Sequence, residues 1–477
     1  MIAENTLYAK LKQVWGYDQF RSPQDEIIRT LRTGRDSLIL MPTGGGKSLC
    51  FQLPALLQPG LTLVVSPLVA LMENQVQVLQ EKHLPAALLH SELSGHQRRQ
   101  ILQATRQGKL RLLYLSPETL LSQPVWDVLC EPSLPIYHLI LDEAHCLAQW
   151  GESFRPAYYR LGAVRPALQA LKPHQPRITI AAFTATANPH AQQTIQRVLQ
   201  LRQPKAFRLS PYRPNLSLSV KVVWTPRGRR QQLLQYIRAR QDQTGLVYVR
   251  TRRDSEELAD WLTEEGFPTA AYHAGLGASD RRRIEQAWLK DGIRFVVCTC
   301  AFGMGIDKPS CRWIIHLHAP LLLAEYVQEV GRGGRDGQPA EALTLISEPT
   351  GWLDPEDRQR QQFFLEKIRS QQQTARKLAP RLPPQGEVAT IARQFPDGAL
   401  SLSWLHSTGQ LHWQDPFHYR LKQGNVAQGA IDLNQQAAQE MTQYLHTKEC
   451  RWRFLLRAFG FTTEAEGFAC GHCDNCA

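Results

Sequence analysis

Short apolar runs alternate with segments of helical periodicity through the first part of the chain. After the run Ser37–Leu40 (SLIL) come LTLVVS, RLLYLS, IYHLILDEAH and ITIAAFTAT, each short enough for one buried strand. Apolar strands separated by helices are typical of a mostly parallel sheet covered by helices. The pattern therefore predicts an α/β lobe over residues 1–208.

The segment Arg208–Asn215 (RLSPYRPN) interrupts this pattern with two prolines, which favour a domain boundary. A second series of strand-like runs follows: LSLSVKVV, GLVYV, TAAYHA, FVVCT, WIIHLH and EALTLIS. This series predicts a second α/β lobe over residues 209–348.

The last third of the chain has a different pattern. Residues 349–385 are rich in glutamine and charge and predict a helical connector that ends in a proline-rich linker. Within 386–430, two helical segments precede LHWQDPFHYRL, which reads as a hairpin, and this order is typical of a winged helix. A plain helical linker with a surface hairpin is an equal alternative. Residues 431–477 predict a helical region that holds a cysteine cluster.

The segment Met41–Ser48 (MPTGGGKS) joins the first strand to a helix. A strand, a glycine-rich turn, Lys-Ser and a helix can place backbone N–H groups, an ammonium group and a hydroxyl around a nucleoside triphosphate. We expect the cradle to consist of Thr43, Gly44, Gly45 and Gly46, with Lys47 on the phosphates and Ser48 on Mg²⁺. A glycine turn with an incidental lysine is the alternative.

The acidic pair Asp142 and Glu143 ends the apolar run IYHLILDEAH. A parallel sheet presents its catalytic edge at the carboxyl ends of its strands. There Asp142 can hold Mg²⁺, directly or through water, and Glu143 can polarise the attacking water. An acidic helix cap is the alternative, but it leaves the upstream phosphate loop unexplained.

Tyr17, Arg21 and Gln24 precede the phosphate loop at spacings of four and three, so that on a helix they share one face. An aromatic ring can stack on a purine while an amide reads its edge. A capping or surface role is equally compatible with the spacing.

The stretch CLAQWGESFRPAYYR follows the acidic pair and is rich in aromatic residues. Aromatic side chains beside a nucleotide site can stack on nucleobases. From composition alone, a satellite core is the better interpretation of Trp150, Phe154, Tyr158 and Tyr159.

The formal net charge of +12 favours a polyanionic partner, although a solvated basic surface gives the same number. The excess lies in the first 350 residues, where three arginine clusters, at 227–230, 250–253 and 281–283, include solvated helix faces and candidate phosphate contacts. Arg332 and Arg335 stand three residues apart beside glycines. An arginine that reaches a γ-phosphate from an opposite lobe would stabilise the charge of phosphoryl transfer.

Four cysteines near the end of the chain are spaced as metal ligands: Cys450, Cys470, Cys473 and Cys476. Four thiolates so arranged predict a tetrahedral zinc site that ties the last helices to the lobes. His472 is a possible substitute ligand, and a chance cluster or a redox switch is the alternative. No apolar run approaches ~18 residues, so we expect a cytoplasmic protein without a membrane contact.

With these motifs in view, the sequence resembles the RecQ family of DNA helicases. WGYDQFRSPQ resembles the adenine-reading element of the family, MPTGGGKS its phosphate loop, and DEAHCLAQWGESFRP its magnesium motif with the aromatic-rich loop. AFTATA, YHAGL, AFGMGIDKP and QEVGRGGRDG follow in the family's order, and CGHCDNC resembles its zinc-binding region.

The resemblance implies two RecA-like lobes that use ATP, Mg²⁺ and Zn²⁺. It implies 3′ to 5′ movement on single-stranded DNA and unwinding of tailed duplexes in DNA repair and recombination. The implied ATPase site combines Lys47, Ser48, Asp142 and Glu143 with Gln328, Arg332 and Arg335, of which Arg335 is the preferred arginine finger. The implied coupling between DNA contact and hydrolysis runs through His145, Trp150, Phe154 and Arg155. We expect a monomer, whereas protein partners stay open.

Three residues depart from the family pattern: Ala148, Val330 and Gly333. These departures put in question how strongly DNA contact is coupled to hydrolysis, but not hydrolysis itself. The sequence stops one residue after Cys476, so unless the insert supplies a wedge we expect short-range unwinding. A single-strand-stimulated ATPase translocase with weak unwinding, or an ATP-independent annealing scaffold, is the alternative function. RNA as the substrate is a weaker one.

Overall fold

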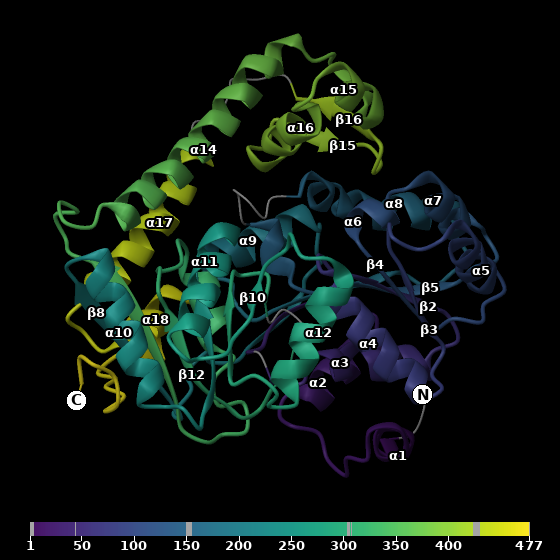
Figure 1. Ribbon diagram of the computed structural model, residues 1–477. Helices are drawn as coiled ribbons and strands as arrows, with labels where there is room; N and C mark the ends of the chain where they lie inside the picture. The colour runs from purple at the N-terminus through teal and green to yellow at the C-terminus, as the bar shows by residue number, and fades with distance from the viewer. Residues whose placement is uncertain are drawn as a thin grey trace. The chain divides into compact units, whose positions relative to one another are not determined.

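The computed structural model describes residues 4–42, 44–148, 155–302, 306, 308–422 and 430–476. The chain divides into two compact units (Figure 1). The first holds most of the chain up to Leu209 together with Lys367–Asp432, and the second holds Ser210–Glu366 and Leu433–Ala477. The change at Leu209 falls inside the proline-containing segment RLSPYRPN. The five predicted domain ranges are finer than this division and stay predictions.

The first unit contains a seven-stranded parallel sheet in the order β3-β4-β2-β5-β6-β1-β7. The strands are β1 (Ser37–Leu40), β2 (Leu61–Val65), β3 (Ala86–Leu89), β4 (Leu112–Leu115), β5 (Ile136–Leu141), β6 (Thr179–Thr184) and β7 (Lys205–Arg208). The helices are α1 (Glu4–Trp15), α2 (Gln24–Arg32), α3 (Lys47–Leu57), α4 (Val69–Glu81), α5 (Gly95–Arg106), α6 (Pro117–Leu120), α7 (Gln123–Cys130), α8 (Val164–Leu171) and α9 (Pro189–Val198), with the 3-10 helices η1 (Ala144–Leu147) and η2 (Pro156–Ala163).

The two faces of this sheet are both covered. Successive residues of β1 point to opposite faces, so Leu38 belongs to one apolar cluster and Ile39 to another. This explains why the predicted strands are continuous apolar runs. The pattern missed β3 and β7; β7 (KAFR) has a charged residue at each end and buries only Phe207.

The second unit has a six-stranded parallel sheet in the order β10-β11-β9-β12-β13-β8. Every strand predicted for the second lobe is present: β8 (Leu216–Val223), β9 (Thr244–Tyr248), β10 (Ala271–Tyr272), β11 (Phe295–Cys298), β12 (Cys311–His316) and β13 (Ala340–Ser347). The helices are α10 (Pro226–Arg238), α11 (Arg252–Glu264), α12 (Ala278–Leu289), α13 (Leu323–Val330), α18 (Arg451–Ala458) and α19 (Thr462–Ala465). Two longer helices, α14 (Glu356–Leu378) and α17 (Ala430–His446), connect the units.

The chain between α14 and α17 forms the predicted insert, a small α/β module (Figure 1). It consists of η3 (Ala379–Arg381), β14 (Gln385–Glu387), α15 (Val388–Gln394), α16 (Gly398–Ser407), β15 (Leu411–Trp413) and β16 (His418–Leu421). The two predicted helices and the hairpin are present, and the unpredicted β14 completes an antiparallel sheet in the order β14-β16-β15. Trp404, Trp413 and Tyr419 belong to a buried apolar cluster that the insert shares with α14 and with Ala163 of η2, and a plain linker would lack such a cluster.

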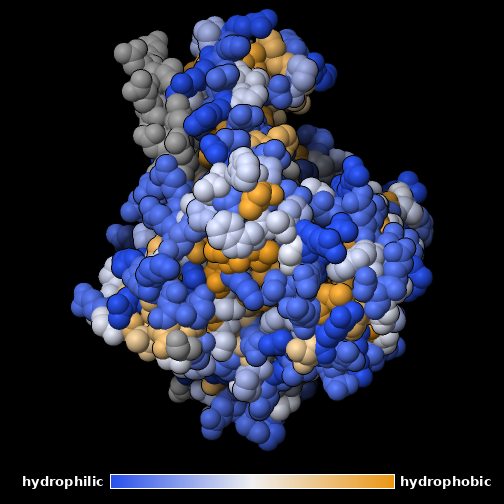
Figure 2. All heavy atoms as spheres, turned by 60° about the vertical axis from the view of Figure 1, so that its left-hand side comes forward, coloured by the Kyte–Doolittle hydropathy of each residue, from blue (hydrophilic) through white to orange (hydrophobic). Residues whose placement is uncertain are grey.

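Hydrophilic residues cover most of the molecular face drawn in Figure 2. Of the helices that the structure describes, none combines the length and the apolar sequence that a bilayer crossing requires.

Candidate nucleotide and zinc sites

The phosphate loop has the predicted path from strand to turn to helix. β1 ends at Leu40, and α3 begins at Lys47. Gly44 and Gly46 have φ angles of 80° and 78°, a backbone region that favours glycine. A Cβ atom on Gly46 would lie 2.4 Å from the Gln24 amide nitrogen, so a larger residue there would have to displace that amide. Thr43 lies outside the described residues.

The Gln24 side chain is hydrogen-bonded to the backbone of this loop. Its Nε2 donates to the Gly45 carbonyl at 3.1 Å, and its Oε1 accepts from the backbone N–H of Arg21 at 3.0 Å. Gln24 is 4% exposed, whereas Tyr17 is 55% exposed. The predicted base-reading residues therefore differ in their present use: the amide supports the loop, and the ring faces solvent.

The acidic pair lies at the same edge of the sheet as the phosphate loop. β1 pairs with β6, and β6 pairs with β5, which Asp142 and Glu143 directly follow. The Lys47 Nζ lies 3.4 Å from the Glu143 Oε1, and both side chains are largely buried. Glu143 has a φ of 51°, a strained conformation for a residue with a side chain. Such strain persists where neighbouring contacts fix it, here those to Lys47 and His145.

The two carboxyl groups have opposite protonation tendencies. Burial, reinforced by the adjacent Glu143 charge, raises the pKa of Asp142 to about 6. Burial would also raise the pKa of Glu143, but Lys47 and His145 outweigh it and hold that pKa well below its usual range. Burial opposes the His145 cation, yet the Cys146 sulfur and Glu143 raise its pKa to about 10. Glu143 is thus an anion held between two cations.

Thr184 links these groups and was missed by sequence reasoning. Its hydroxyl lies 3.2 Å from the His145 Nδ1 and accepts from the Thr186 N–H at 3.1 Å, while its carbonyl accepts from the Met41 N–H at 2.9 Å. The available signal was the run AFTAT, a strand that ends in threonines at the carboxyl edge. Thr184 connects the beginning of the phosphate loop to the acidic motif.

The residues at this edge fit a magnesium-bound triphosphate. Mg²⁺ prefers oxygen ligands and is held in proteins by a few carboxylates or hydroxyls together with the substrate's phosphates. Ser48 and Asp142 supply the hydroxyl and the carboxylate, and Lys47 supplies the positive charge. When bound, the metal would neutralise charge on the phosphate oxygens.

Gln328, Arg332 and Arg335 belong to the second unit. Gln328 lies half-buried on α13, and Arg332 is 6% exposed. The Arg335 guanidinium donates to the carbonyls of Ile306 at 3.2 Å and of Gly331 at 3.4 Å. The structure brings these three residues together around the end of α13. Their reach toward a nucleotide stays a prediction.

Two hydrogen bonds to the turn that carries these arginines were missed by sequence reasoning. Arg213 and Asn215 donate to the Gly334 carbonyl at 2.6 Å and 2.7 Å. Both come from RLSPYRPN, in which the prolines indicated only a boundary. Two of the three departures from the family pattern sit in close packing: Val330 is buried in the core, and a Cβ added at Gly333 would lie 3.3 Å from the Ala340 side chain.

A buried ion pair stands next to Gln328 and was also missed. Glu329 accepts from Arg250 at 2.9 Å and lies 2.9 Å from the His316 Nε2. Burial would raise the pKa of Glu329, but Arg250 and His316 lower it to about 2. Arg250, from the second arginine cluster, is therefore a structural partner of α13.

The aromatic-rich stretch divides into two parts. Tyr158 and Tyr159 lie fully buried on η2 in the core of the first unit, as the satellite-core interpretation predicts. The Arg155 guanidinium donates to Glu118 at 3.4 Å and stays partly exposed. Trp150 and Phe154 lie outside the described residues. His145 lies 5% exposed between the acidic motif and this stretch.

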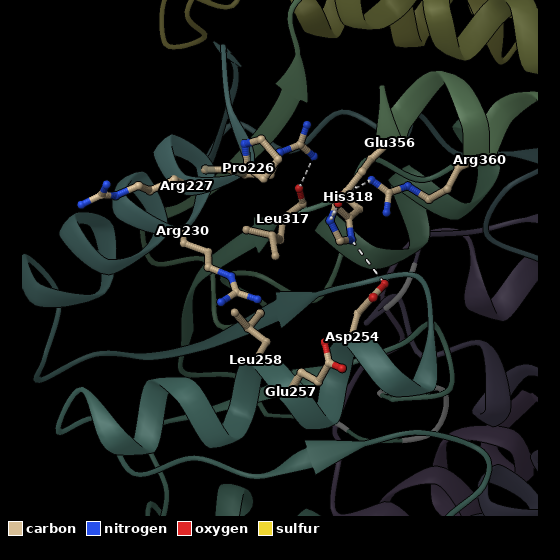
Figure 3. A pocket seen from close by; sticks show the side chains of 11 residues that line it. Pro226, Arg227, Arg230, Asp254, Glu257, Leu258, Leu317, His318, Glu356 and Arg360 are labelled. Carbon is tan, nitrogen blue, oxygen red and sulfur yellow. Dashed lines mark hydrogen bonds and ion pairs between the residues drawn. The ribbon is translucent and has the colours of Figure 1, made fainter. Parts of the chain in front are cut away.

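A cavity of about 450 Å³ lies beside α10 and α11 in the second unit (Figure 3). Arg229 from the first arginine cluster is ion-paired there with Asp354 at 2.9 Å, and His318 lies 3.3 Å from Glu356. The lining residues are Pro226, Arg227, Arg229, Arg230, Asp254, Glu257, Leu258, Leu317, His318, Glu356 and Arg360. Four arginines face three carboxylates, so the cavity lacks the strong positive balance that a polyanion requires.

The four predicted zinc ligands meet in the second unit. The sulfur atoms of Cys450, Cys470, Cys473 and Cys476 all lie within 4.8 Å of one another. Backbone N–H groups of Arg451 and Cys470 donate to the sulfurs of Cys473 and Cys450. Four converging sulfurs fit a tetrahedral zinc site, and amide donors stabilise thiolates.

This cluster is joined to the second sheet. Asp474 accepts from the N–H of Val220 on β8 at 2.8 Å and from Arg451 at 2.8 Å, and the Trp452 indole donates to the Leu216 carbonyl at 3.1 Å. His472 lies 3.3 Å from the Tyr212 hydroxyl, which gives its imidazole a partner other than the sulfurs. The predicted tie between the zinc region and a lobe is present.

Family models match three parts of the chain. The DEAD/DEAH box helicase model covers residues 21–195, the helicase conserved C-terminal domain covers 228–337, and the RecQ zinc-binding model covers 417–477. The ATP-dependent DNA helicase RecQ of Synechocystis sp. is 52% identical over 476 residues, which span 100% of this chain and 99% of that protein. The chain belongs to the RecQ family of DNA helicases. It is therefore an ATP hydrolase whose cofactors are ATP, Mg²⁺ and Zn²⁺, as predicted.

A shorter match is the Haemophilus influenzae RecQ helicase, 39% identical over 390 residues, which span 79% of this chain and 61% of that protein. Solved structures show the same two-lobed fold. Mss116p bound to single-stranded RNA and AMP-PNP has a TM-score of 0.60 at 14% identity and covers 92% of this RecQ chain and 93% of its own. Dbp5 of S. cerevisiae bound to RNA and ADP BeF3 has a TM-score of 0.59 at 16% identity, with 77% and 94% covered. The predicted pair of RecA-like lobes is confirmed.

Proposed function

We propose that this RecQ protein moves 3′ to 5′ along single-stranded DNA at the expense of ATP and separates duplexes that carry a 3′ tail. The carrying observation is the meeting of Lys47, Asp142 and Glu143 at the carboxyl edge of one sheet, where the Lys47 ammonium is 3.4 Å from Glu143. Family membership supports DNA as the polyanion. The proposed setting is DNA repair and recombination in the cytoplasm, with the protein as a monomer.

The proposed ATP-binding groups belong to the first unit. The backbone from Thr43 to Gly46 cradles the phosphates, Lys47 neutralises them, and Ser48 and Asp142 hold Mg²⁺. Glu143 orients the attacking water, for which its lowered pKa keeps it anionic. Tyr17, Arg21 and Gln24 contact the adenine.

The second unit supplies charge to the same reaction in this proposal. Gln328, Arg332 and Arg335 approach the γ-phosphate, and Arg335 acts as the arginine finger. Support comes from the turn that carries the arginines, which Arg213 and Asn215 fasten through the Gly334 carbonyl. His145, Trp150, Phe154 and Arg155 transmit the presence of DNA to the acidic pair. The contact of His145 with both Glu143 and Thr184 supports this route.

Strand displacement tests the proposed function. Duplexes with a 3′ tail, a 5′ tail or no tail are incubated with the full chain and Mg²⁺·ATP, with Lys47→Ala as the inactive control. We expect displacement from the 3′-tailed duplex alone and none with Lys47→Ala. Displacement that persists in Lys47→Ala would show an activity that does not depend on ATP hydrolysis, and would favour the ATP-independent scaffold over the motor.

A translocase with weak unwinding is the second candidate. The hairpin tip of the insert favours it, because that tip is engaged by the first unit: Arg160 donates to the Pro416 carbonyl at 3.3 Å. A hairpin used in this way does not offer its tip as a wedge. ATPase stimulated by single strands, without displaced strands, would select this candidate.

A further inference from the structure

Residues 210–216, which directly follow the change of unit at Leu209, contact two parts of the second unit that are distant from each other in the sequence. One part is the zinc region, residues 450–476, which holds the four cysteines. The other is the turn after α13, residues 331–338, which carries Arg332 and Arg335. We call this second part the arginine turn.

Tyr212 packs against aromatic rings of the zinc region. Its ring centroid lies 4.9 Å from that of Phe468 and 5.4 Å from that of Trp452, both in edge-to-face geometry. Its hydroxyl lies 3.3 Å from the Nε2 of His472, which stands between two predicted zinc ligands. The Trp452 indole also donates to the Leu216 carbonyl at 3.1 Å. The zinc region therefore holds residues 210–216 at two points.

Arg213 and Asn215 hold the arginine turn by hydrogen bonds. The Arg213 guanidinium donates to the carbonyls of Gly333 at 3.2 Å and Gly334 at 2.6 Å. The Asn215 amide donates to the carbonyls of Gly334 and Gln338, each at 2.7 Å. Asn215 therefore joins the middle of the turn to its end.

The arginine turn fits closely around these donors. Gly334 has a φ of 55°, and a Cβ on it would lie 2.5 Å from the Asn215 amide nitrogen. The Gly334 N–H donates to the Cys311 carbonyl at 2.8 Å. Arg335 is the next residue, and its guanidinium donates to the Ile306 carbonyl at 3.2 Å. A displacement of Asn215 would therefore move the backbone that carries Arg335.

We propose that the zinc region positions Arg335 for phosphoryl transfer through Tyr212 and Asn215. The proposal rests on the proposed function, in which Arg335 is the arginine finger. Tyr212 and Asn215 are positioning residues, because they act on the reaction through the backbone of the arginine turn. A misplacement of about 1 Å can cost about 10²-fold in rate, so a firmly held turn matters to catalysis.

Single-turnover ATP hydrolysis by the full chain with single-stranded DNA tests this proposal. Tyr212→Leu removes the ring contacts with the zinc region, and Asn215→Ala removes both hydrogen bonds to the arginine turn. The matched control is Tyr236→Leu, a half-buried tyrosine of the same unit whose ring meets Trp313 edge to face at 5.9 Å. Each substitution is also made in an Arg335→Ala background. Fluorescent ADP binding, zinc per chain and Tm are measured for every variant.

We expect hydrolysis by Tyr212→Leu and by Asn215→Ala to fall by about 10- to 100-fold. ADP affinity should stay unchanged, because the phosphate loop is not altered. In the Arg335→Ala background neither substitution should lower the residual rate further, since effects that act through one group are not additive. Tyr212→Phe keeps the ring contacts and should retain most of the wild-type rate, and Tyr236→Leu should retain it as well.

Two results would overturn the proposal. One is a rate in Tyr212→Leu and Asn215→Ala equal to that of the control, and the other is a loss of the same size with and without Arg335. If Tyr212→Leu loses zinc, Asn215→Ala decides, because the Asn215 amide is bonded to the arginine turn and not to the cysteine cluster. Failure of the proposed function appears separately, as an Arg335→Ala rate equal to that of the wild type.

Discussion

The ammonium nitrogen of Lys47 lies 3.4 Å from the carboxylate of Glu143, although 96 positions separate them in the sequence. The two residues follow β1 and β5, whose carboxyl ends lie at the same edge of the parallel sheet. The strand order therefore brings the pair together. The contact gives Lys47 a counter-ion until a triphosphate competes for it. The same contact keeps Glu143 anionic and suited to orient water.

Glu143→Gln should separate nucleotide binding from hydrolysis. The amide keeps the size of the side chain but cannot act as the anionic base, so hydrolysis should fall by about 10²–10⁴-fold. ATP affinity should stay the same or rise, because Lys47 loses its competitor. Steady-state ATPase and fluorescent nucleotide binding measure the two effects. Equal losses in both would contradict the role assigned to Glu143.

The pH dependence of Mg²⁺·ADP binding should report Asp142. Its pKa of about 6 means that the carboxyl gains a proton as the pH falls through 6, so Mg²⁺·ADP affinity should decline there. Glu143→Gln removes the neighbouring charge and should shift this decline to lower pH. Titration of ADP itself is common to both proteins and cancels in the comparison. Identical midpoints would show that Asp142 is not the titrating group.

Gly46→Ala should destroy the phosphate loop. Its Cβ would lie 2.4 Å from Gln24, at a φ of 78°, and such backbone strain costs about 1–3 kcal/mol. We expect lost ATP binding with a small drop in Tm. Gly95→Ala is the matched control, since a Cβ there meets nothing within 4 Å. Wild-type ATP affinity in Gly46→Ala would refute the tight fit.

Cys470→Ser should lower the zinc content and loosen the attachment to β8. The Asp474 and Trp452 contacts with that strand depend on the fold of the cysteine cluster. Zinc per chain and thermal unfolding are the measurements, and Cys130→Ser outside the cluster is the control. A full zinc complement at wild-type stability in Cys470→Ser would remove Cys470 from the ligand set.

Phe417→Ala should weaken stimulation by DNA while leaving the basal ATPase unchanged. Phe417 anchors the insert on Trp126, and the insert packs on η2, which follows the aromatic-rich stretch. ATPase titrated with single-stranded DNA gives both quantities. Arg393→Ala on the exposed side of α15 should change neither. If Phe417→Ala behaves like that control, insert docking does not influence the DNA response.

Local sequence pattern predicted much of this molecule. Three motifs indicate their chemistry within a few residues: MPTGGGKS directly after a strand, the acidic pair at the end of β5, and the cysteine spacing of CGHCDNC. The role of Gln24 in holding Gly45, the link through Thr184 and the fastening of Gly334 by Asn215 were missed. Each joins segments that are distant in sequence and depends on strand order, which periodicity does not encode. The packing of α16 on η2 was not predicted for the same reason, because the sequence of an apolar helix face does not indicate which element it packs against.

The most direct test of ATP-driven DNA movement is the ATPase rate of the full chain with and without single-stranded DNA, beside Lys47→Ala. We predict that DNA raises the wild-type rate several times and that Lys47→Ala has no activity in either condition. A wild-type rate indifferent to DNA, or a Lys47→Ala rate equal to it, would contradict the proposed motor.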